Sequence, residues 1–292
     1  MGWRTVCITE PTKLELKLGY LVARSEQTTR ISLSEIETLI VESTSSALTT
    51  ALLCELSKRK IKVIFCDEKH NPYAELIDYY GSTDCLRRLK EQLAWSDERC
   101  EWVWTEIVRE KILRQATLLK EQKQDLAAQM LHQYIEELKP GDSGNREAHA
   151  AKVYFNALFD EGFSRQHDSP LNAALNYGYS LLLSSFNKAI VSRGYLTQLG
   201  LHHHNTFNPF NFSSDLMEPY RPLVDRFVLS YEFTQFKKEE KHLMLEVLNL
   251  KVKIGDTQQL LQQAIDRYCS SVFTALNSQK PQQIEFYQWY DS

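Results

Sequence analysis

The sequence is poor in the features that build disulfide frameworks, flexible linkers or membrane spans. Its six cysteines are scattered and form no C-x-x-C pair, which favours reduced thiols over structural disulfides. With only 10 glycines and 8 prolines among 292 residues, the composition excludes collagen-like and low-complexity chains. No apolar run is long enough to span a membrane, and the N-terminus lacks the charge and apolar pattern of a signal peptide. We therefore expect a soluble, cytoplasmic protein that does not bind membranes.

An excess of positive charge is also missing. The 34 Lys and Arg residues face 38 Asp and Glu residues, which gives a formal net charge of −4. Proteins that bind nucleic acid usually present a basic surface, so such a contact here requires local basic patches. The hydrophobic content of 43% is typical of a globular protein, and the length allows one large domain or two ordinary ones.

The first 80 residues carry the alternating, β-branched patterns of short strands. Runs at residues 5–8, 14–18 and 20–23 are separated by turn-forming proline and glycine, which suits antiparallel strands. Apolar positions from 48 to 56 then follow helical spacing. These patterns predict a small N-terminal β-rich domain over residues 1–80, β-sandwich-like and carrying one helix.

A polar segment at residues 67–83, which contains proline and glycine breakers, marks the expected domain boundary. Beyond it, helical spacing of apolar residues recurs, interrupted by stop signals such as the segment 139–144. The break at residues 254–256 is expected to be a loop between packed helices. The sequence therefore predicts an α+β protein in which residues 81–292 form a larger, all-α catalytic domain.

Histidine and carboxylate side chains gather between residues 200 and 224. Three consecutive histidines, His202 to His204, precede Asp215 and Glu218, which share one face of a predicted helical turn. Adjacent side chains of an extended segment point to opposite faces, and no cysteine is nearby, so a zinc site built from the three histidines is disfavoured. One imidazole and two carboxylates suit Mn²⁺ or Mg²⁺. The same histidines are equally compatible with a polar loop that binds nothing.

A further acidic residue lies upstream, on a helix that Asn145 is expected to cap. Glu147 falls on the stripe formed by Ala151, Tyr154 and Leu158, which helical spacing assigns to the core. Burial of an unpaired carboxylate is costly, so this position needs an explanation. Either the first turn of the helix favours an acid near solvent, or Glu147 has a function. The local sequence does not choose between the two.

Three blocks of residues together resemble a known family. They read GDSGNREAHAAKVYF at residues 141–155, LNAALNYGY at 171–179, and LGLHH followed by DLMEPYRP between 199 and 222. In order and spacing they resemble the CRISPR-associated integrase of spacer acquisition, the first of the two universal adaptation proteins, and particularly its type II form. The β-then-α order and the length of the chain agree with this family.

The resemblance implies a site as well as a fold. It places the family's glutamate, histidine and acidic metal ligands at Glu147, His203 and Glu218, which would be the catalytic residues. Asp215 matches an acidic position that also serves the metal in some members. The two neighbouring histidines compete with His203 for the imidazole role, and the family spacing favours His203.

The activity implied by the resemblance is insertion of protospacer DNA into the CRISPR array. A 3′-hydroxyl of short double-stranded DNA would attack a phosphodiester of the repeat, with Mn²⁺ or Mg²⁺ polarising the phosphate, and the site would also act as a DNA endonuclease. The implied partners are a second copy in a homodimer formed through the N-terminal domain, and a dimer of the second universal adaptation protein. In type II systems they include the RNA-guided effector nuclease and an additional small adaptation protein.

Other classes of protein stay open. One is a metal-dependent phosphohydrolase acting on a small nucleotide, and another is a non-catalytic scaffold that binds DNA or partners. An acidic chain that binds DNA needs a local surface of lysine and arginine. Candidate contacts near the three blocks are Arg146, Lys152, Arg193 and Arg221, each equally compatible with a structural ion pair or a solvated charge.

Overall fold

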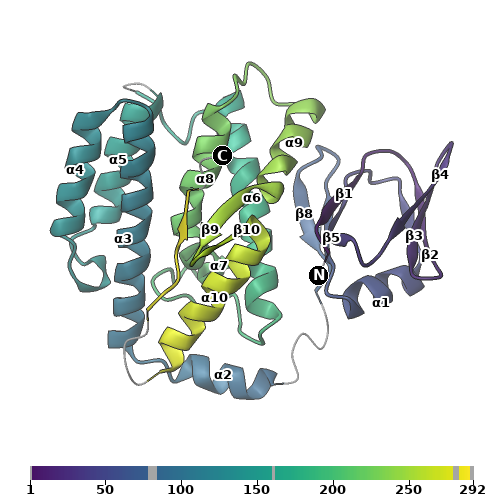
Figure 1. Ribbon diagram of the computed structural model, residues 1–292, viewed down its shortest axis with the longest axis horizontal. Coiled ribbons are helices and arrows are strands. Elements are labelled where there is room, and N and C mark those ends of the chain that lie inside the picture. The colour runs from purple at the N-terminus through teal and green to yellow at the C-terminus, as the bar shows by residue number, and fades with distance from the viewer. Residues whose placement is uncertain (1, 78–83, 160–161, 279–282, 290–292) are drawn as a thin grey trace.

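The computed structural model describes residues 2–77, 84–159, 162–278 and 283–289. Its N-terminal part contains two four-stranded sheets and one helix, at the purple end of the colour scale in Figure 1. The strands of the first sheet are, in spatial order, β1 (Arg4–Ile8), β5 (Ile36–Val41), β7 (Lys62–Cys66) and β8 (Pro72–Glu75). Those of the second are β4 (Thr28–Ser32), β3 (Tyr20–Arg24), β2 (Lys13–Lys17) and β6 (Ala47–Leu48).

The first sheet is largely parallel, so the prediction of antiparallel strands is wrong for this sheet. β1 pairs with β5 and β5 with β7 in parallel, whereas β8 runs antiparallel to β7. Parallel neighbours need a long connection between them. Strands β2 to β4 supply it between β1 and β5, and helix α1 (Thr50–Lys58) supplies it between β5 and β7. In the second sheet β2, β3 and β4 are antiparallel, as predicted.

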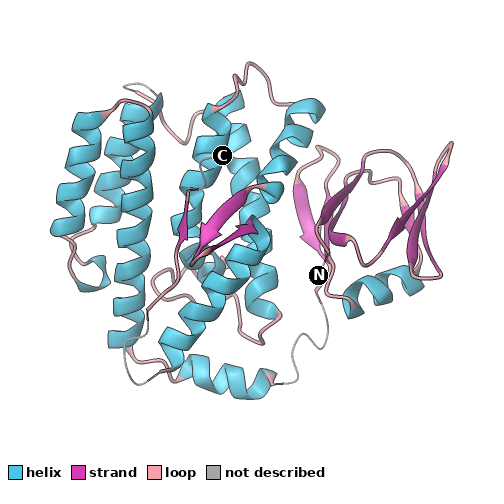
Figure 2. Cartoon of the chain, in the orientation of Figure 1, coloured by secondary structure: helices cyan, strands magenta, loops and turns pink. Residues whose placement is uncertain are grey.

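The two sheets and α1 lie together in Figure 2 and enclose one apolar core. Leu14 and Leu21 of the second sheet belong to the same core as Leu39 and Val63 of the first. Leu52 of α1 completes it, and all five side chains are fully buried. The alternating apolar positions of the strands therefore face the space between the sheets.

The rest of the chain is mainly helical. Its helices are α2 (Cys85–Leu93), α3 (Asp97–Glu121), α4 (Asp125–Glu136), α5 (Arg146–Phe159), α6 (Pro170–Val191), α7 (Asn211–Met217), α8 (Arg221–Leu229), α9 (Lys238–Met244) and α10 (Leu261–Asn277). Short 3₁₀ turns are η1 (Pro140–Asp142), η2 (Glu218–Tyr220) and η3 (Leu245–Asn249). Within the described ranges, no helix has the length and apolar character needed to cross a bilayer.

A small antiparallel sheet interrupts the helices, so the prediction of an all-α domain over residues 81–292 is wrong at this point. β9 (Lys251–Ile254) and β10 (Thr257–Leu260) form a hairpin, and β11 (Tyr287–Gln288) pairs with the other edge of β9. Gly255 has φ +58 in the hairpin turn, a conformation that glycine adopts without strain. Strands of four residues are too short for their alternation to stand out. The predicted boundary at residue 80 lies outside the described residues and stays a prediction.

The two parts of the chain pack closely against each other. The second face of the first sheet carries Ile40, Ile64 and Cys66, which belong to the large core of the helical part. The Lys188 ammonium of α6 also lies 2.5 Å from the Glu37 carboxylate of β5. Figure 1 shows α6 to α10 between the N-terminal sheets and the group formed by α3, α4 and α5. The candidate residues lie where α3, α5 and the α7–α8 segment meet.

Candidate active site

Glu218 is held in a buried position by the chain bend between α7 and α8. α7 ends one residue earlier, and Pro219 follows Glu218 in the 3₁₀ turn. The Glu218 side chain is 6% exposed, and Nε of Arg221 donates to its Oε1 at 2.9 Å. Its other carboxylate oxygen accepts a hydrogen bond from the Lys111 ammonium, which projects from α3.

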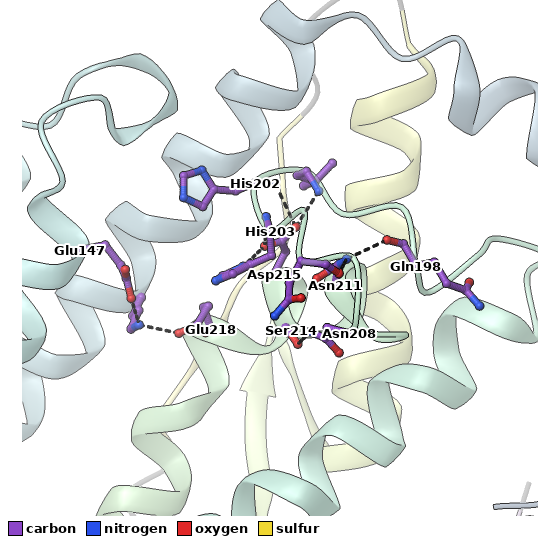
Figure 3. A network of polar contacts seen from close by, with 12 residues as sticks. Glu147, Gln198, His202, His203, Asn208, Asn211, Ser214, Asp215 and Glu218 are labelled. Carbon is purple, nitrogen blue, oxygen red and sulfur yellow. Dashed lines mark hydrogen bonds and ion pairs between the residues drawn. The ribbon is translucent and has the colours of Figure 1, made fainter. Parts of the chain in front are cut away.

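Glu147 reaches the same lysine from the first turn of α5. The backbone N–H groups of Arg146 and Glu147 donate to the Asp142 carboxylate at 2.7 and 3.0 Å. Asp142, rather than Asn145 as predicted, therefore caps this helix. The Lys111 ammonium donates to Oε1 of Glu147, and Figure 3 shows the side chains of Glu147 and Glu218 pointing toward each other. One ammonium nitrogen thus contacts two carboxylates that lie far apart in the sequence.

These opposite charges keep the buried groups ionised. Burial alone would raise the pKa of Glu218, but the charges of Arg221 and Lys111 outweigh it and lower that pKa to about 2. Burial alone would lower the pKa of Lys111, but the charges of Glu218 and Glu147 raise it overall. Glu218 is therefore an ionised carboxylate at neutral pH, held between the Lys111 and Arg221 cations.

Asp215 organises the loop that carries the three histidines. Its Oδ2 accepts hydrogen bonds from the backbone N–H groups of Leu201 and His202, at 2.6 and 3.0 Å. Its Oδ1 accepts from the backbone N–H of His203 at 3.2 Å and lies 2.5 Å from Nδ1 of the same residue. The loop passes so close that a Cβ on Gly200 would lie 2.4 Å from the carbonyl oxygen of His203. Both oxygens of this fully buried carboxylate are thus already engaged.

The three histidines occupy different surroundings. The His202 ring stacks on the buried Trp104 of α3, with centroids 4.5 Å apart and an interplanar angle of 5°. His203 meets the same indole edge-on at 5.8 Å. His204 lines a separate hollow beside Asn205 and Phe207. Of the three rings, His203 is the one bonded to Asp215.

His203 also lies within electrostatic reach of both glutamates. The hydrogen bond with Asp215 is the main cause that raises the pKa of this imidazole, and burial opposes it. The negative charges of Glu218 and Glu147 raise the pKa further. In Figure 3 the side chains of Glu147, Glu218 and His203 converge from three segments of the chain. The structure thus brings together the three residues that the sequence nominated.

Three of the four basic residues nominated for DNA contact form ion pairs within the chain. Arg146 lies 2.7 Å from the Glu137 carboxylate. Arg193 lies 2.5 Å from Asp266, and Arg221 pairs with Glu218 as described above. The fourth, Lys152, is exposed on α5.

A small cavity of about 220 Å³ opens beside the two glutamates. Its walls include Lys111, Arg165, Arg221 and Asp225. Arg165 is oriented by the side-chain oxygen of Asn172, to which it donates at 2.6 Å. Sequence reasoning missed Lys111 and Arg165. The signal for Lys111 was its place seven residues after Trp104 on the buried stripe of α3, where a charged residue needs a partner.

Replacement of Lys111 by methionine should destabilise the metal-free protein by about 1–3 kcal/mol, because it removes the buried cation that Glu218 and Glu147 share, while Arg221 still pairs with Glu218. Added Mn²⁺ should raise the melting temperature of this variant more than that of the wild type. Thermal unfolding with and without Mn²⁺ measures both effects. The matched control is Lys152→Met on the exposed face of α5, which should behave as the wild type. Equal responses of the two variants would contradict the prediction.

Asp225 should make stability depend on pH. It is 1% exposed and accepts a hydrogen bond from Tyr154 at 2.8 Å, yet burial raises its pKa to about 6. An acid with a raised pKa favours folding below its unfolded value of about 3.9, and this contribution is lost as pH rises through about 6. Relative to Asp225→Asn, the wild type should therefore lose about 2 kcal/mol between pH 4 and pH 7. Urea unfolding at several pH values tests this, and parallel curves for the two proteins would contradict it.

Known proteins resemble this chain over most of its length. The family model described as "CRISPR associated protein Cas1" matches residues 6–251. A protein of Neisseria meningitidis named "CRISPR-associated endonuclease Cas1" is 34% identical over 292 residues, which cover 98% of this chain and 96% of the relative.

Two solved structures share the fold at lower identity. A casposase bound to an integration product has a TM-score of 0.76 at 19% identity, with 97% of this chain and 93% of the casposase covered. A chain of a Cas6-RT-Cas1–Cas2 complex has a TM-score of 0.72 at 16% identity, with 97% of this chain and 36% of that longer chain covered. The mixed α+β fold is thus confirmed. Because the family model matches most of the chain and the Neisseria relative matches nearly all of it, the protein belongs to the Cas1 family of CRISPR-associated proteins.

Proposed function

We propose that this protein is a metal-dependent DNA integrase with endonuclease activity, which inserts protospacer DNA into CRISPR repeats by attack of a 3′-hydroxyl on a phosphodiester. The observation that carries the proposal is the meeting of Glu147 and Glu218 on one ammonium, beside His203, in a chain of the Cas1 family. The Neisseria relative is named an endonuclease, and the structurally similar casposase is bound to an integration product.

The donor set fits a divalent cation. An oxygen of Glu147 and an oxygen of Glu218 both reach the Lys111 nitrogen, so a position between them already accepts positive charge. Two carboxylates and one imidazole suit Mn²⁺ or Mg²⁺ with water positions left open. We infer that Glu147, Glu218 and His203 hold this ion, which would polarise the scissile phosphodiester and stabilise the charge that develops in the transition state.

Asp215 orients one of these ligands, His203. Asp215 faces Nδ1 of His203, so Nε2 is the nitrogen left to bind the ion or to accept the proton of the attacking hydroxyl. Because both Asp215 oxygens are engaged by the loop, we propose that Asp215 positions His203 and does not bind the metal. This is the role of a carboxylate that fixes a metal-binding histidine.

Cationic side chains that can bind a phosphodiester line the cavity, although the chain as a whole is acidic. Arg165, Arg221 and Lys111 bring positive charge to the space beside Glu147. Guanidinium groups bind phosphate oxygens with two parallel hydrogen bonds, which fixes the orientation of the phosphate as well as its place. Lys111 and Arg221 are paired with Glu147 and Glu218, so Arg165 is the residue that adds positive charge to this wall beyond those pairs.

The expected partners follow from the same proposal. They are the protospacer and the CRISPR repeat as double-stranded DNA, a second copy of this chain, and a dimer of the second universal adaptation protein. A solved complex that contains Cas2 has a chain with this fold. The RNA-guided effector nuclease and a small additional adaptation protein are the further partners expected in a type II system. We assign the dimer contact to the N-terminal domain at residues 1–80.

A strand-transfer assay tests the proposal. A fluorescent short duplex is mixed with this protein, the second adaptation protein and a supercoiled plasmid carrying a repeat. Covalent joining should require Mn²⁺ or Mg²⁺ and a free 3′-hydroxyl, so a duplex with 3′-dideoxy ends should give no product. Turnover of free nucleotides without strand transfer would favour the phosphohydrolase, and DNA binding without any product would favour the scaffold.

A further inference from the structure

A second group of potential metal ligands lies outside the candidate active site, where the first sheet meets α9. Nε2 of His242 lies 2.6 Å from Oε2 of Glu42, and Sγ of Cys7 lies 3.5 Å from the same oxygen. Nδ1 of His70 lies 3.1 Å from Oε1 of Glu42. One ligand atom from each of Cys7, Glu42 and His242 lies within 4.8 Å of the other two.

The topology explains why these side chains meet. The parallel strands β1, β5 and β7 end at the same edge of the sheet. Cys7 is the penultimate residue of β1, and Glu42 directly follows β5, where its N–H donates to the carbonyl of Ile8 at 2.9 Å. His70 lies in the turn after β7, with φ +61 and its N–H bonded to the carbonyl of Asp67.

The fourth residue comes from the helical part of the chain. His242 is on α9, which Lys241 anchors to the same turn by donating to the carbonyl of Lys69. Cys7 packs against the large helical core rather than the core between the sheets. The group therefore spans the junction of the two parts.

Glu42 is poorly satisfied by its protein neighbours. Its side chain is only 3% exposed, yet Oε1 accepts no hydrogen bond, and Nδ1 of His70 beside it is also buried without one. A buried polar atom left without a partner costs about 1–3 kcal/mol. The ammonium of the nearby Lys241 is directed to a backbone carbonyl, so it does not supply the missing partner. A cation bound between these groups would satisfy both atoms.

We propose that Cys7, Glu42 and His242 form a structural site for a zinc-class transition metal, with His70 beside Glu42 as the candidate for a fourth position. A thiolate, a carboxylate and an imidazole are ligands that zinc uses, and the sulfur and nitrogen donors select against Mg²⁺ and Mn²⁺. Binding would release the thiol proton of Cys7 to solvent, because the thiolate is the form that coordinates. The metal would fasten the N-terminal sheet to α9. This role is independent of the proposed catalysis, which uses other residues.

Metal analysis and cobalt spectroscopy test the proposal on the full chain. Protein purified without chelators should contain about one zinc per chain by mass spectrometry of the metal. Co²⁺ added to the metal-depleted protein should give the charge-transfer absorption of a thiolate ligand, which the sulfur-free candidate active site cannot produce. Cys7→Ser should abolish this band and lower the zinc affinity by more than about 100-fold.

Two controls separate this site from other binding. Cys54→Ser removes an exposed cysteine on α1, and Glu147→Ala removes a candidate catalytic ligand; both variants should keep the zinc and the cobalt band. His242→Gln should lose zinc and show a lower melting temperature that added zinc no longer raises. Wild-type protein that holds no zinc and gives no thiolate–cobalt band would overturn the proposal, and this result needs no variant. Unchanged zinc affinity in folded Cys7→Ser would overturn it equally.

Discussion

Replacement of Glu147 by alanine should reduce metal-dependent joining of DNA by about 10³-fold or more. The Lewis-acid contribution of a bound metal is worth several kcal/mol, and each 1.4 kcal/mol corresponds to a tenfold change in rate. The fold should survive, because Glu147 is 29% exposed and Lys111 keeps Glu218 as its partner. Dimerisation and binding of the second adaptation protein should therefore be unchanged. The measurement is the initial rate of strand transfer at saturating Mn²⁺.

A matched variant tests whether the loss of any one acidic side chain lowers the joining rate. Glu136 is exposed on α4, and Glu136→Ala should join DNA at the wild-type rate. Glu147→Gln, which keeps the size of the side chain but not its charge, should be impaired nearly as much as the alanine variant. Full joining activity in Glu147→Ala would end the proposal that this carboxylate binds the catalytic metal.

Asp215→Ala should affect stability and activity together. It leaves the buried N–H of Leu201 and the partly buried N–H groups of His202 and His203 without their acceptor, which we expect to cost about 1–3 kcal/mol. Loss of the partner that holds a metal-binding histidine typically lowers metal affinity or activity by about 10–100-fold. Guanidinium unfolding without metal and strand transfer over a range of Mn²⁺ concentrations measure the two effects.

The stability measurement separates two roles of Asp215. A positioning residue stabilises the loop in the absence of any metal, so Asp215→Ala should unfold at lower denaturant than the wild type even in chelator. Glu147→Ala, in contrast, should be close to the wild type under these conditions. Unchanged metal-free stability in Asp215→Ala would contradict the positioning role.

Two kinds of feature could be predicted from the sequence: elements with a local periodic pattern, and residues in motifs that resemble those of the family. The β-rich start, the helical remainder and the nomination of Glu147 rest on such signals. The choice of His203 among the three histidines rests on the family spacing, and the structure adds that Trp104 stacks on His202 whereas Asp215 bonds to His203. Neither contact produces a periodic pattern in the sequence.

Features that depend on distant partners could not be predicted in the same way. Lys111 is separated from Glu218 by 107 positions, and Glu42 from His242 by 200, so neither pairing has a local pattern. The parallel register of β1, β5 and β7 follows from crossovers, which strand periodicity does not report. The β9–β10 hairpin is shorter than the window in which alternation can be recognised.

We propose that Glu147, His203 and Glu218 hold one divalent metal for strand transfer. Anomalous X-ray diffraction from crystals of the protein soaked in Mn²⁺ tests it most directly, because the signal identifies the element and its place. We expect one manganese peak in contact with these three side chains, with Asp215 still bonded to His203 and not in direct contact with the ion. Manganese bound elsewhere, with Glu147 and Glu218 still closed on Lys111 at saturating Mn²⁺, would contradict it.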